Sequence, residues 1–409
     1  MMKFLRIAIR NVFRNPRRTA FTMLVIVFGA VAMILAGGFI ASQFKGLREM
    51  TIRNGLGHLQ IYTAQYVAKG EEHALANGIE QPAELEQFLA KQPHVVATTQ
   101  EIELVGLISN GDKSETFLGR GIDPAKQDAM GFNTTLKSGR VLDPRSTESE
   151  AVLGSGLAEA MKVKVGDPLT LMSTTTNGAL NAVDIKVVGT FSTGIKEFDA
   201  RALKVSVGTA QTLLDTNRVT KVIVKLDDTQ NTDTAAAAIG AALKSSGHNQ
   251  VAIKTWRDLA GFYKQVVALY ASIFVFLGII IFILVILSSS NTMMMTVLER
   301  VQEIGTLLAL GTRRRQIVLI FLLEGLVIGF LGGLLGWVAG FGALSLINRA
   351  GITMPPPPSF SRGISLHINF VPELFVGVLL LVTTVLVLSA VIPAVRASRL
   401  HIVDALRHV

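Results

Sequence analysis

The sequence predicts an α-helical membrane protein with four transmembrane helices and a large α+β domain between the first and the second. Half of the 409 residues are hydrophobic and the mean hydropathy is positive, so the chain is more apolar than an ordinary soluble domain. Four stretches contain the roughly 20 apolar residues that are needed to cross the hydrocarbon core of a bilayer. Between the first two lies a polar stretch of roughly 220 residues, enough for one or two folded lobes.

The distribution of charge predicts how these segments are oriented. Residues 1–18 carry six basic side chains and no acid, whereas residues 45–264 carry 24 basic and 25 acidic side chains. Because basic residues collect on the cytoplasmic side of membrane proteins, we expect both termini and the loop between the second and third spans to be cytoplasmic, with the large domain outside. The net charge of +9 is therefore a signal of topology, and we expect no binding to nucleic acid.

Together these patterns divide the chain into nine predicted segments. They are a cytoplasmic amphipathic helix (1–18), a first transmembrane helix (19–44), a periplasmic α+β domain (45–264), a second transmembrane helix (265–291), a cytoplasmic loop containing a short helix (292–315), a third transmembrane helix (316–347), a short periplasmic loop (348–370), a fourth transmembrane helix (371–395) and a cytoplasmic tail (396–409).

The N-terminal residues 2–14 combine apolar side chains with arginines, which is typical of an amphipathic helix on a membrane surface. Its arginines can reach anionic headgroups. A simple positively charged anchor ahead of the first span explains the same pattern equally well. Asn15-Pro16 is expected to break this helix, and Pro393 is expected to end the fourth span.

Within residues 45–264, strand-like runs alternate with helical patterns, which predicts the α+β domain. Residues 110–200 are a candidate second lobe inserted into the first. Strands are expected at 58–62, 95–99, 102–108, 169–172, 183–191, 203–207 and 221–226, and helices at 82–91, 156–161, 209–215 and 232–244.

The loop between the second and third spans has helical periodicity. Apolar residues recur at Val297, Val301, Ile304 and Leu308, which places them on one helical face. Gly311 is placed to end the helix. A short amphipathic helix on one face of the membrane indicates a contact surface for a partner.

The third span contains two ridges of glycines and one carboxylate. Glycines four residues apart let helix backbones approach closely in lipid, so we expect this span to pack against another span of this chain or of a second copy. Glu324 is a candidate functional residue because intramembrane carboxylates usually are; a position at the membrane boundary, paired with a nearby arginine, explains it equally well. The ridges are Gly325, Gly329 and Gly333, and Gly332, Gly336 and Gly340.

No sequence pattern for catalysis or cofactor binding is found. The phosphate-binding pattern G-x-x-x-x-G-K-[ST] is absent, and Ser155 does not lie in a G-x-S-x-G elbow. The chain has no cysteine, and its seven histidines are scattered, so there is no candidate metal site. We therefore expect no catalytic residue, metal or cofactor on this chain.

Several motifs resemble one family. The run Glu-Arg-Val-Gln-Glu-Ile-Gly from Glu299, with Leu-Ala-Leu-Gly from Leu308, resembles the signature loop of the FtsX-like permeases of ABC transporters. Glu324-Gly325 and the run Pro-Ala-Val-Arg-Ala from Pro393 resemble the next span and the tail of that family. The run Gly-His-Leu-Gln-Ile from Gly57 resembles the start of the periplasmic core domain in its MacB and lipoprotein-release (LolC/LolE) branches.

This resemblance implies a bacterial inner-membrane complex with two permease copies, identical or paralogous, in contact with membrane lipids. It implies a separate cytoplasmic ATPase that binds ATP and Mg²⁺, because the 18-residue leader leaves no room for an ATPase domain. A periplasmic adaptor or carrier is a further implied partner. The implied ATPase-docking residues are Glu299, Arg300, Glu303, Ile304 and Leu307, with Gly311 closing the helix.

The function that the resemblance implies is mechanotransmission, in which ATP hydrolysis on the partner drives a shape change of the periplasmic domain. Such a permease exports or extracts a lipidic or amphipathic substrate, for example a lipoprotein. The alternative is a regulatory scaffold that activates a periplasmic partner without transport, as in the cell-division branch. The large external domain favours transport, because the domain of the division branch is expected to be much smaller.

Overall fold

The computed structural model describes residues 2–14, 16–69, 75–132, 135–247, 250–355 and 364–400. The chain divides into two compact units, which we call the helical unit and the α+β unit. The helical unit comprises Met1–Lys45, Val266–Met354 and Ser365–Val409, and the α+β unit comprises Gly46–Gln265 with Pro355–Ile364.

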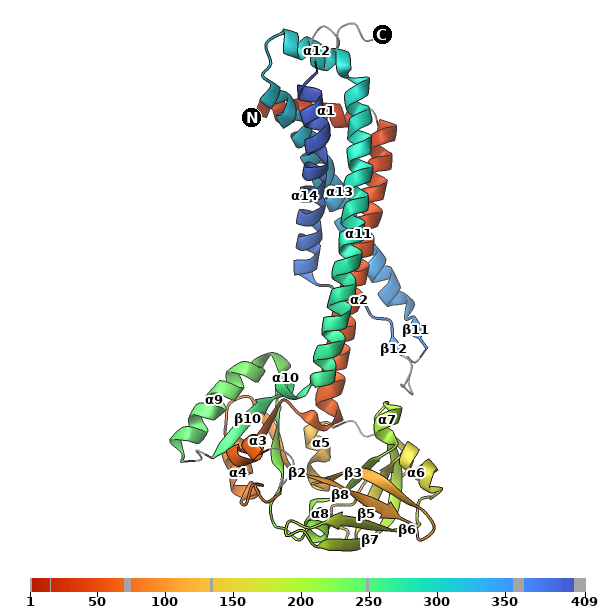
Figure 1. The fold of residues 1–409 in the computed structure, drawn as a ribbon, viewed down its shortest axis with the longest axis vertical. Coiled ribbons are helices and arrows are strands. Elements are labelled where there is room, and N and C mark those ends of the chain that lie inside the picture. The colour runs from red at the N-terminus through yellow and green to blue at the C-terminus, as the bar shows by residue number, and fades with distance from the viewer. Residues whose placement is uncertain are drawn as a thin grey trace. The chain divides into compact units, whose positions relative to one another are not determined.

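Six helices contribute to the helical unit (Figure 1). Among the described residues, four of them are long and apolar enough to cross a membrane: α2, α11, α13 and α14. The predicted fold class is therefore confirmed for these four helices. The six are α1 (Met2–Arg14), α2 (Pro16–Thr51), α11 (Gly261–Glu299), α12 (Val301–Ala309), α13 (Arg314–Ala350) and α14 (Pro372–Ser398), and a two-stranded ribbon joins β11 (Thr353–Met354) to β12 (Ile364–Ser365).

The two proline predictions have opposite outcomes. The break at Pro16 is confirmed, since α1 ends at Arg14 and α2 begins at Pro16. The prediction that Pro393 ends the fourth span is wrong, because α14 continues to Ser398 with Pro393 buried inside it. Ala394 and Ala397 pack into a core with residues of α11, α12 and α13, and such packing outweighs one lost backbone hydrogen bond. Of the predicted loop and tail, residues 356–363 and 401–409 lie outside the described residues.

The α+β unit is built on one ten-stranded mixed sheet with the order β10-β1-β9-β2-β3-β8-β5-β7-β4, while β6 pairs with β2 and β7. The strands are β1 (Leu59–Thr63), β2 (Val95–Ser109), β3 (Ser114–Ile122), β4 (Thr135–Gly139), β5 (Glu150–Gly154), β6 (Pro168–Thr174), β7 (Leu180–Ser192), β8 (Ala202–Ser206), β9 (Lys221–Leu226) and β10 (Val251–Thr255). The helices are α3 (Ala64–Lys69), α4 (Pro82–Leu89), α5 (Gln127–Met130), α6 (Ser155–Met161), α7 (Lys196–Asp199), α8 (Val207–Leu214), α9 (Thr232–Ser245) and α10 (Trp256–Leu259).

The long strand β2 connects the two halves of this sheet. Its first part pairs with β9, and its second part pairs with β3 and β6. The two strands predicted at 95–99 and 102–108 are therefore one strand, with a register shift between Val95 and Ala97. The sequence patterns missed β3, whose Gly119 and Gly121 look like strand breakers; a Cβ on Gly121 would lie 2.5 Å from that of Ala210.

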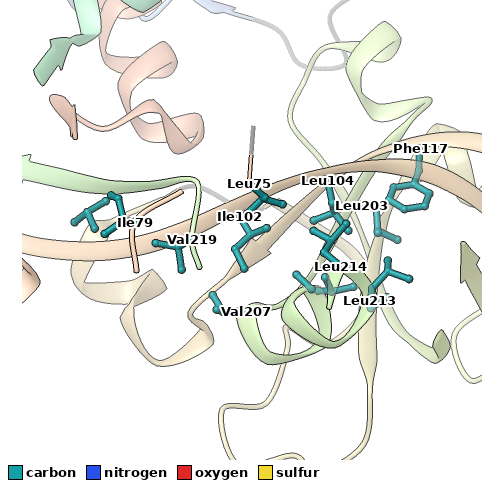
Figure 2. Close-up of a cluster of buried hydrophobic side chains, with 14 of the residues drawn as sticks. Leu75, Ile79, Ile102, Leu104, Phe117, Leu203, Val207, Leu213, Leu214 and Val219 are labelled. Carbon is teal, nitrogen blue, oxygen red and sulfur yellow. The ribbon is translucent and has the colours of Figure 1, made fainter. Parts of the chain in front are cut away.

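One hydrophobic core runs beneath both halves of the sheet. Figure 2 shows Leu213 and Leu214 of α8 facing Ile102 and Leu104 of β2 and Leu203 of β8. All five side chains are buried. Burial of this kind contributes about 1.5–3 kcal/mol for each large aliphatic side chain, so the continuous core supports one continuous sheet.

The two chain ends of the α+β unit pack against each other. After α2, a π-helical turn (Ile52–Leu56) ends at glycines with positive φ angles. Ile52 of this turn is buried against Trp256 and Ala260, with Tyr263 of α11 packed beside them. The indole of Trp256 and the ring of Tyr263 are in T-shaped contact at 5.4 Å. The π-helical turn that follows α2 and the first turn of α11 therefore share one small core.

A buried histidine lies beside this junction. The Nδ1 atom of His58 accepts a hydrogen bond of 3.2 Å from the Leu226 amide, so the ring proton lies on Nε2, 3.1 Å from the Thr229 hydroxyl oxygen. That hydroxyl donates to Glu49 at 3.2 Å. Burial is the main cause that lowers the pKa of His58, because desolvation disfavours the charged imidazole. Burial therefore favours the neutral imidazole of His58, which lies between the π-helical turn and β1.

Candidate functional site

The short helix α12 has one buried and one exposed face. A non-helical residue, Arg300, separates it from α11 with φ −116° and ψ 18°. Its buried face presents Ile304 and the partly buried Leu308 to a core formed with α11, α13 and α14. Gly311 follows with φ +88°, and its amide donates to the carbonyl of Leu308. The helix predicted from apolar periodicity is therefore confirmed, and Gly311 ends the turn that follows it.

The exposed face of α12 carries only some of the residues predicted to dock a partner. Glu299, Glu303 and Leu307 are exposed, as are the neighbouring Gln302, Thr306 and Leu310. Leu310 is 79% exposed and lies beside the exposed Leu307 on this face.

Two of the predicted docking residues are buried in this chain, and their docking role stays a prediction. Ile304 is 4% exposed and Arg300 is 9% exposed. Ile304 belongs to the apolar stripe of α12 and packs in its core. Arg300 forms ion pairs with Glu303 and Glu324 of this chain, so its charge is already compensated within the chain.

A buried polar network joins α12 to its neighbours. The Oε1 atom of Glu324, on α13, accepts hydrogen bonds from Asn11 Nδ2 at 2.6 Å and from Arg300 Nη1 at 3.1 Å. Glu324 is 4% exposed, so its charge depends on these two donors for compensation. The network ties three elements together, namely α1, α13 and the junction between α11 and α12. Glu324 is thus paired with an arginine, one of the two explanations its position allowed.

A second carboxylate continues the network toward the surface. Glu303 lies 2.5 Å from Nη2 of Arg14 on α1 and 3.4 Å from Nε of Arg300. The hydrogen bond from Arg14, followed by the charges of Arg14 and Arg300, holds the pKa of Glu303 below its usual value. Both partners of the outer pair are about half exposed, so we expect that pair to add at most about 1 kcal/mol.

The network borders a cavity of about 380 Å³ within the helical unit. Ile317, Ile320 and Phe321 of α13 supply apolar walls, while Asn11 and Glu324 supply polar groups. Figure 1 shows α1 and α12 at the same end of the helical unit. The cavity therefore lies where the N-terminal helix, α12 and α13 meet.

The glycines of α13 face two different helices of the same chain. A Cβ on Gly325 or Gly329 would lie 2.9 Å from the α14 backbone, and one on Gly333 would lie 2.7 Å from Leu379 of α14. A Cβ on Gly336 would lie 2.5 Å from that of Ala30 in α2. Gly332 and Gly340 meet Ile26 and Ile34 of α2 in the same way.

Sequence reasoning missed the contribution of α1 to this site. Asn11 shares a helical face with Ala8 and Val12 by its spacing, and both of these neighbours are buried. A polar side chain on a buried face requires a hydrogen-bond partner, and this was the available signal. The sequence pattern could not identify that partner, Glu324, which lies 313 positions away.

Comparison with known proteins gives two family matches that together span most of the chain. Residues 19–242 match the MacB-like periplasmic core domain, and residues 272–402 match the FtsX-like permease C-terminal domain. The first match alone covers more than half of the chain.

Three similar proteins illustrate the range of these matches. An uncharacterized ABC transporter permease, YvrN of Bacillus subtilis, is 25% identical over the full length of both chains. The lipoprotein-releasing system transmembrane protein LolE of Haemophilus influenzae is 24% identical over 95% of each chain. The macrolide export ATP-binding/permease protein MacB of Psychrobacter arcticus is 23% identical over 96% of this chain and 57% of that protein.

Proposed function

The chain belongs to the ABC-transporter permeases that combine a MacB-like periplasmic core domain with an FtsX-like permease domain, and we propose that it couples ATP hydrolysis on a separate cytoplasmic subunit to movement of its α+β domain. The observation that carries this proposal is the two-sided structure of α12. Its inner face packs in a core with α11, α13 and α14, and its outer face exposes leucines beside carboxylates. A force applied to α12 therefore reaches several helices.

The proposed docking surface is the exposed face of α12. It differs from the surface implied by sequence resemblance, because Arg300 and Ile304 support α12 from inside. Apolar contact by Leu307 and Leu310 supplies the association energy. The surface comprises Glu299, Gln302, Glu303, Thr306, Leu307 and Leu310.

In this proposal the protein is a multi-pass protein of the inner membrane, with α1 and α12 in the cytoplasm and the α+β unit in the periplasm. The basic N-terminal segment supports this orientation. ATP and Mg²⁺ are bound by the partner ATPase, and a second permease copy, identical or paralogous, completes the complex. A periplasmic adaptor or carrier is a further partner of the α+β unit.

The proposed substrate is lipidic or amphipathic, such as a lipoprotein. Similarity over nearly the whole length to a protein named for lipoprotein release supports this class. The described structure contains a large α+β unit, which gives a transporter room to hold a substrate or carrier outside the membrane. A regulatory scaffold that transports nothing is the competing function.

The docking surface is tested by co-purification with the ATPase subunit. We expect the double variant Leu307→Asp with Leu310→Asp to weaken association by about tenfold or more, because each change places a carboxylate in an apolar contact. ATPase activity stimulated by the permease is expected to fall in parallel. Leu180→Asp is the matched control, since Leu180 is 77% exposed and lies in the α+β unit.

Unchanged association and stimulation in the double variant would show that α12 is not the docking surface. Substrate release from inner-membrane vesicles then separates the two functions. An ATP-dependent loss of lipoprotein from wild-type vesicles supports transport, and stimulation of ATPase activity with no released lipid or lipoprotein supports the scaffold.

A further inference from the structure

A broad cleft lies on the second half of the sheet, far from α12 in sequence. Its volume is about 830 Å³. Residues of α6, α7, β4 and β7 line it, and Figure 1 shows α6 and α7 beside each other in the α+β unit. This cleft has no part in the function proposed above.

Four lysines line this cleft. Lys137 lies on β4, Lys162 and Lys164 follow α6, and Lys196 begins α7. All four are exposed. Within the described part of the chain, none of their ammonium groups lies within 4 Å of a carboxylate oxygen. Other lysines of the same unit do form such pairs, including Lys126 with Glu86 and Lys186 with Glu148.

The acids in the cleft do not balance these four charges. Asp199 is 3% exposed, and it accepts hydrogen bonds from the Ser192 hydroxyl at 2.6 Å and from the Thr193 amide and hydroxyl at 2.8 and 2.7 Å. Its oxygens are therefore occupied in holding the loop before α7. Asp199 and Glu159 are the two acids of the described lining, so the four lysines leave an excess of two positive charges.

This local excess contrasts with the rest of the domain. Residues 45–264 carry 24 basic and 25 acidic side chains, so the lysines of the cleft are concentrated against a nearly neutral background. Four ammonium groups around one hollow repel one another, and a concave surface of one sign raises the local concentration of counter-ions. A multivalent anion bound in the cleft reduces this repulsion more than chloride ions distributed around it.

We propose that this cleft binds a phosphate-bearing group, such as a phosphomonoester or the phosphodiester headgroup of a lipid. An ammonium is a compact charge with three donors that accepts many orientations of a phosphate. The hydroxyl-bearing residues Ser155 and Thr190 also line the hollow. The concave form suits a compact headgroup better than an extended acidic peptide. The proposal is independent of ATPase docking.

The test uses the full-length protein in nanodiscs of zwitterionic lipid, with binding followed by isothermal titration calorimetry at low salt. The probes are inorganic phosphate, glycerol 1-phosphate and inorganic pyrophosphate, with acetate as the monovalent control anion. We expect wild-type protein to bind at least one phosphate probe, with affinity that falls as salt is raised. Lys162→Gln with Lys196→Gln is expected to weaken that binding by about tenfold.

The matched control is Lys91→Gln with Lys244→Gln, which removes two exposed positive charges from the same unit but outside the cleft. Binding should survive in the control. Stronger binding of glycerol 1-phosphate, together with capture of vesicles containing phosphatidylglycerol, assigns the site to a lipid headgroup. Equal binding of inorganic phosphate assigns it to a free phosphate.

Three results overturn the proposal. They are no phosphate binding by wild-type protein at millimolar probe, equal weakening in the cleft and control variants, or binding of a polyglutamate peptide without binding of any phosphate probe. The last result would assign the cleft to an acidic protein segment. The circular dichroism spectrum of each variant must match that of the wild type for the comparison to count.

Discussion

Replacing Arg300 with glutamine is expected to destabilise the helical unit by about 3 kcal/mol. The change leaves the carboxylate of Glu324 buried, with Asn11 as its remaining described donor. Removing one partner of a buried ion pair usually costs about 3–5 kcal/mol. We take the lower end of that range because the Asn11 amide still donates a hydrogen bond of 2.6 Å.

The cost of this substitution can be measured by thermal unfolding of the purified protein in detergent. For a unit of about 180 residues, 3 kcal/mol corresponds to a midpoint lower by roughly 6–12 °C. Arg14→Gln is the matched control, because Arg14 forms a half-exposed pair with Glu303. That variant is expected to lower stability by at most about 1 kcal/mol.

A double variant isolates the buried charge as the cause. In Arg300→Gln with Glu324→Gln, two neutral amides replace the ion pair, and stability should return to within about 1 kcal/mol of the wild type. The reasoning is refuted if Arg300→Gln and Arg14→Gln cost the same, or if the double variant is no more stable than Arg300→Gln alone.

Two further predictions concern the packing of α13 and the buried histidine. Gly336→Leu should disrupt helix packing and lower the yield of folded protein, because even a Cβ there lies 2.5 Å from that of Ala30. Gly342→Leu on the same helix meets open space and should be tolerated. Similar size-exclusion profiles for the two variants would contradict this prediction. Because the pKa of His58 is lowered in the folded state, the unfolded chain binds the extra proton, so stability should fall as pH drops below about 6.5. His58→Gln should flatten that dependence in thermal unfolding between pH 5.5 and 7.5, and an unchanged slope would assign it to other groups.

The sequence was informative wherever one periodic pattern decided the structure. The four long helices and α12 follow from apolar runs and helical spacing, which are local properties. In the same way, the ridge of Gly325 and Gly329 indicated close helix packing before the partner helix was known. Residue patterns therefore predicted the long helices, α12 and the contact-prone face of α13.

The sequence could not predict the role of a residue whose interaction partner lies far away in the chain. Nothing local distinguishes Arg300 as a buried support for α12 from Arg300 as a docking residue. Arg300 supports α12 from inside because it pairs with Glu324 on α13, and Glu324 in turn accepts a hydrogen bond from Asn11 on α1. Strand β3 was missed for a similar reason, since its glycines are required by neighbouring side chains such as Ala210.

The long helices of the helical unit are buried to different extents, and this difference affects how α12 can transmit a force. In α13, glycine ridges and Glu324 hold α1, α2 and α14, so this helix forms the centre of the unit. By contrast, no residue in the most apolar window of α11 is buried within this chain. Near α12, α11 is held by a hydrogen bond of 2.8 Å between Ser289 and Ser389 and by the buried Met293 and Val297. Because α11 runs directly from α12 to the α+β unit and its apolar window is the least buried of the four candidate spans, we propose that α11 shifts while α13 stays fixed. The proposed mechanism therefore assigns the moving part to α11 and the fixed part to α13.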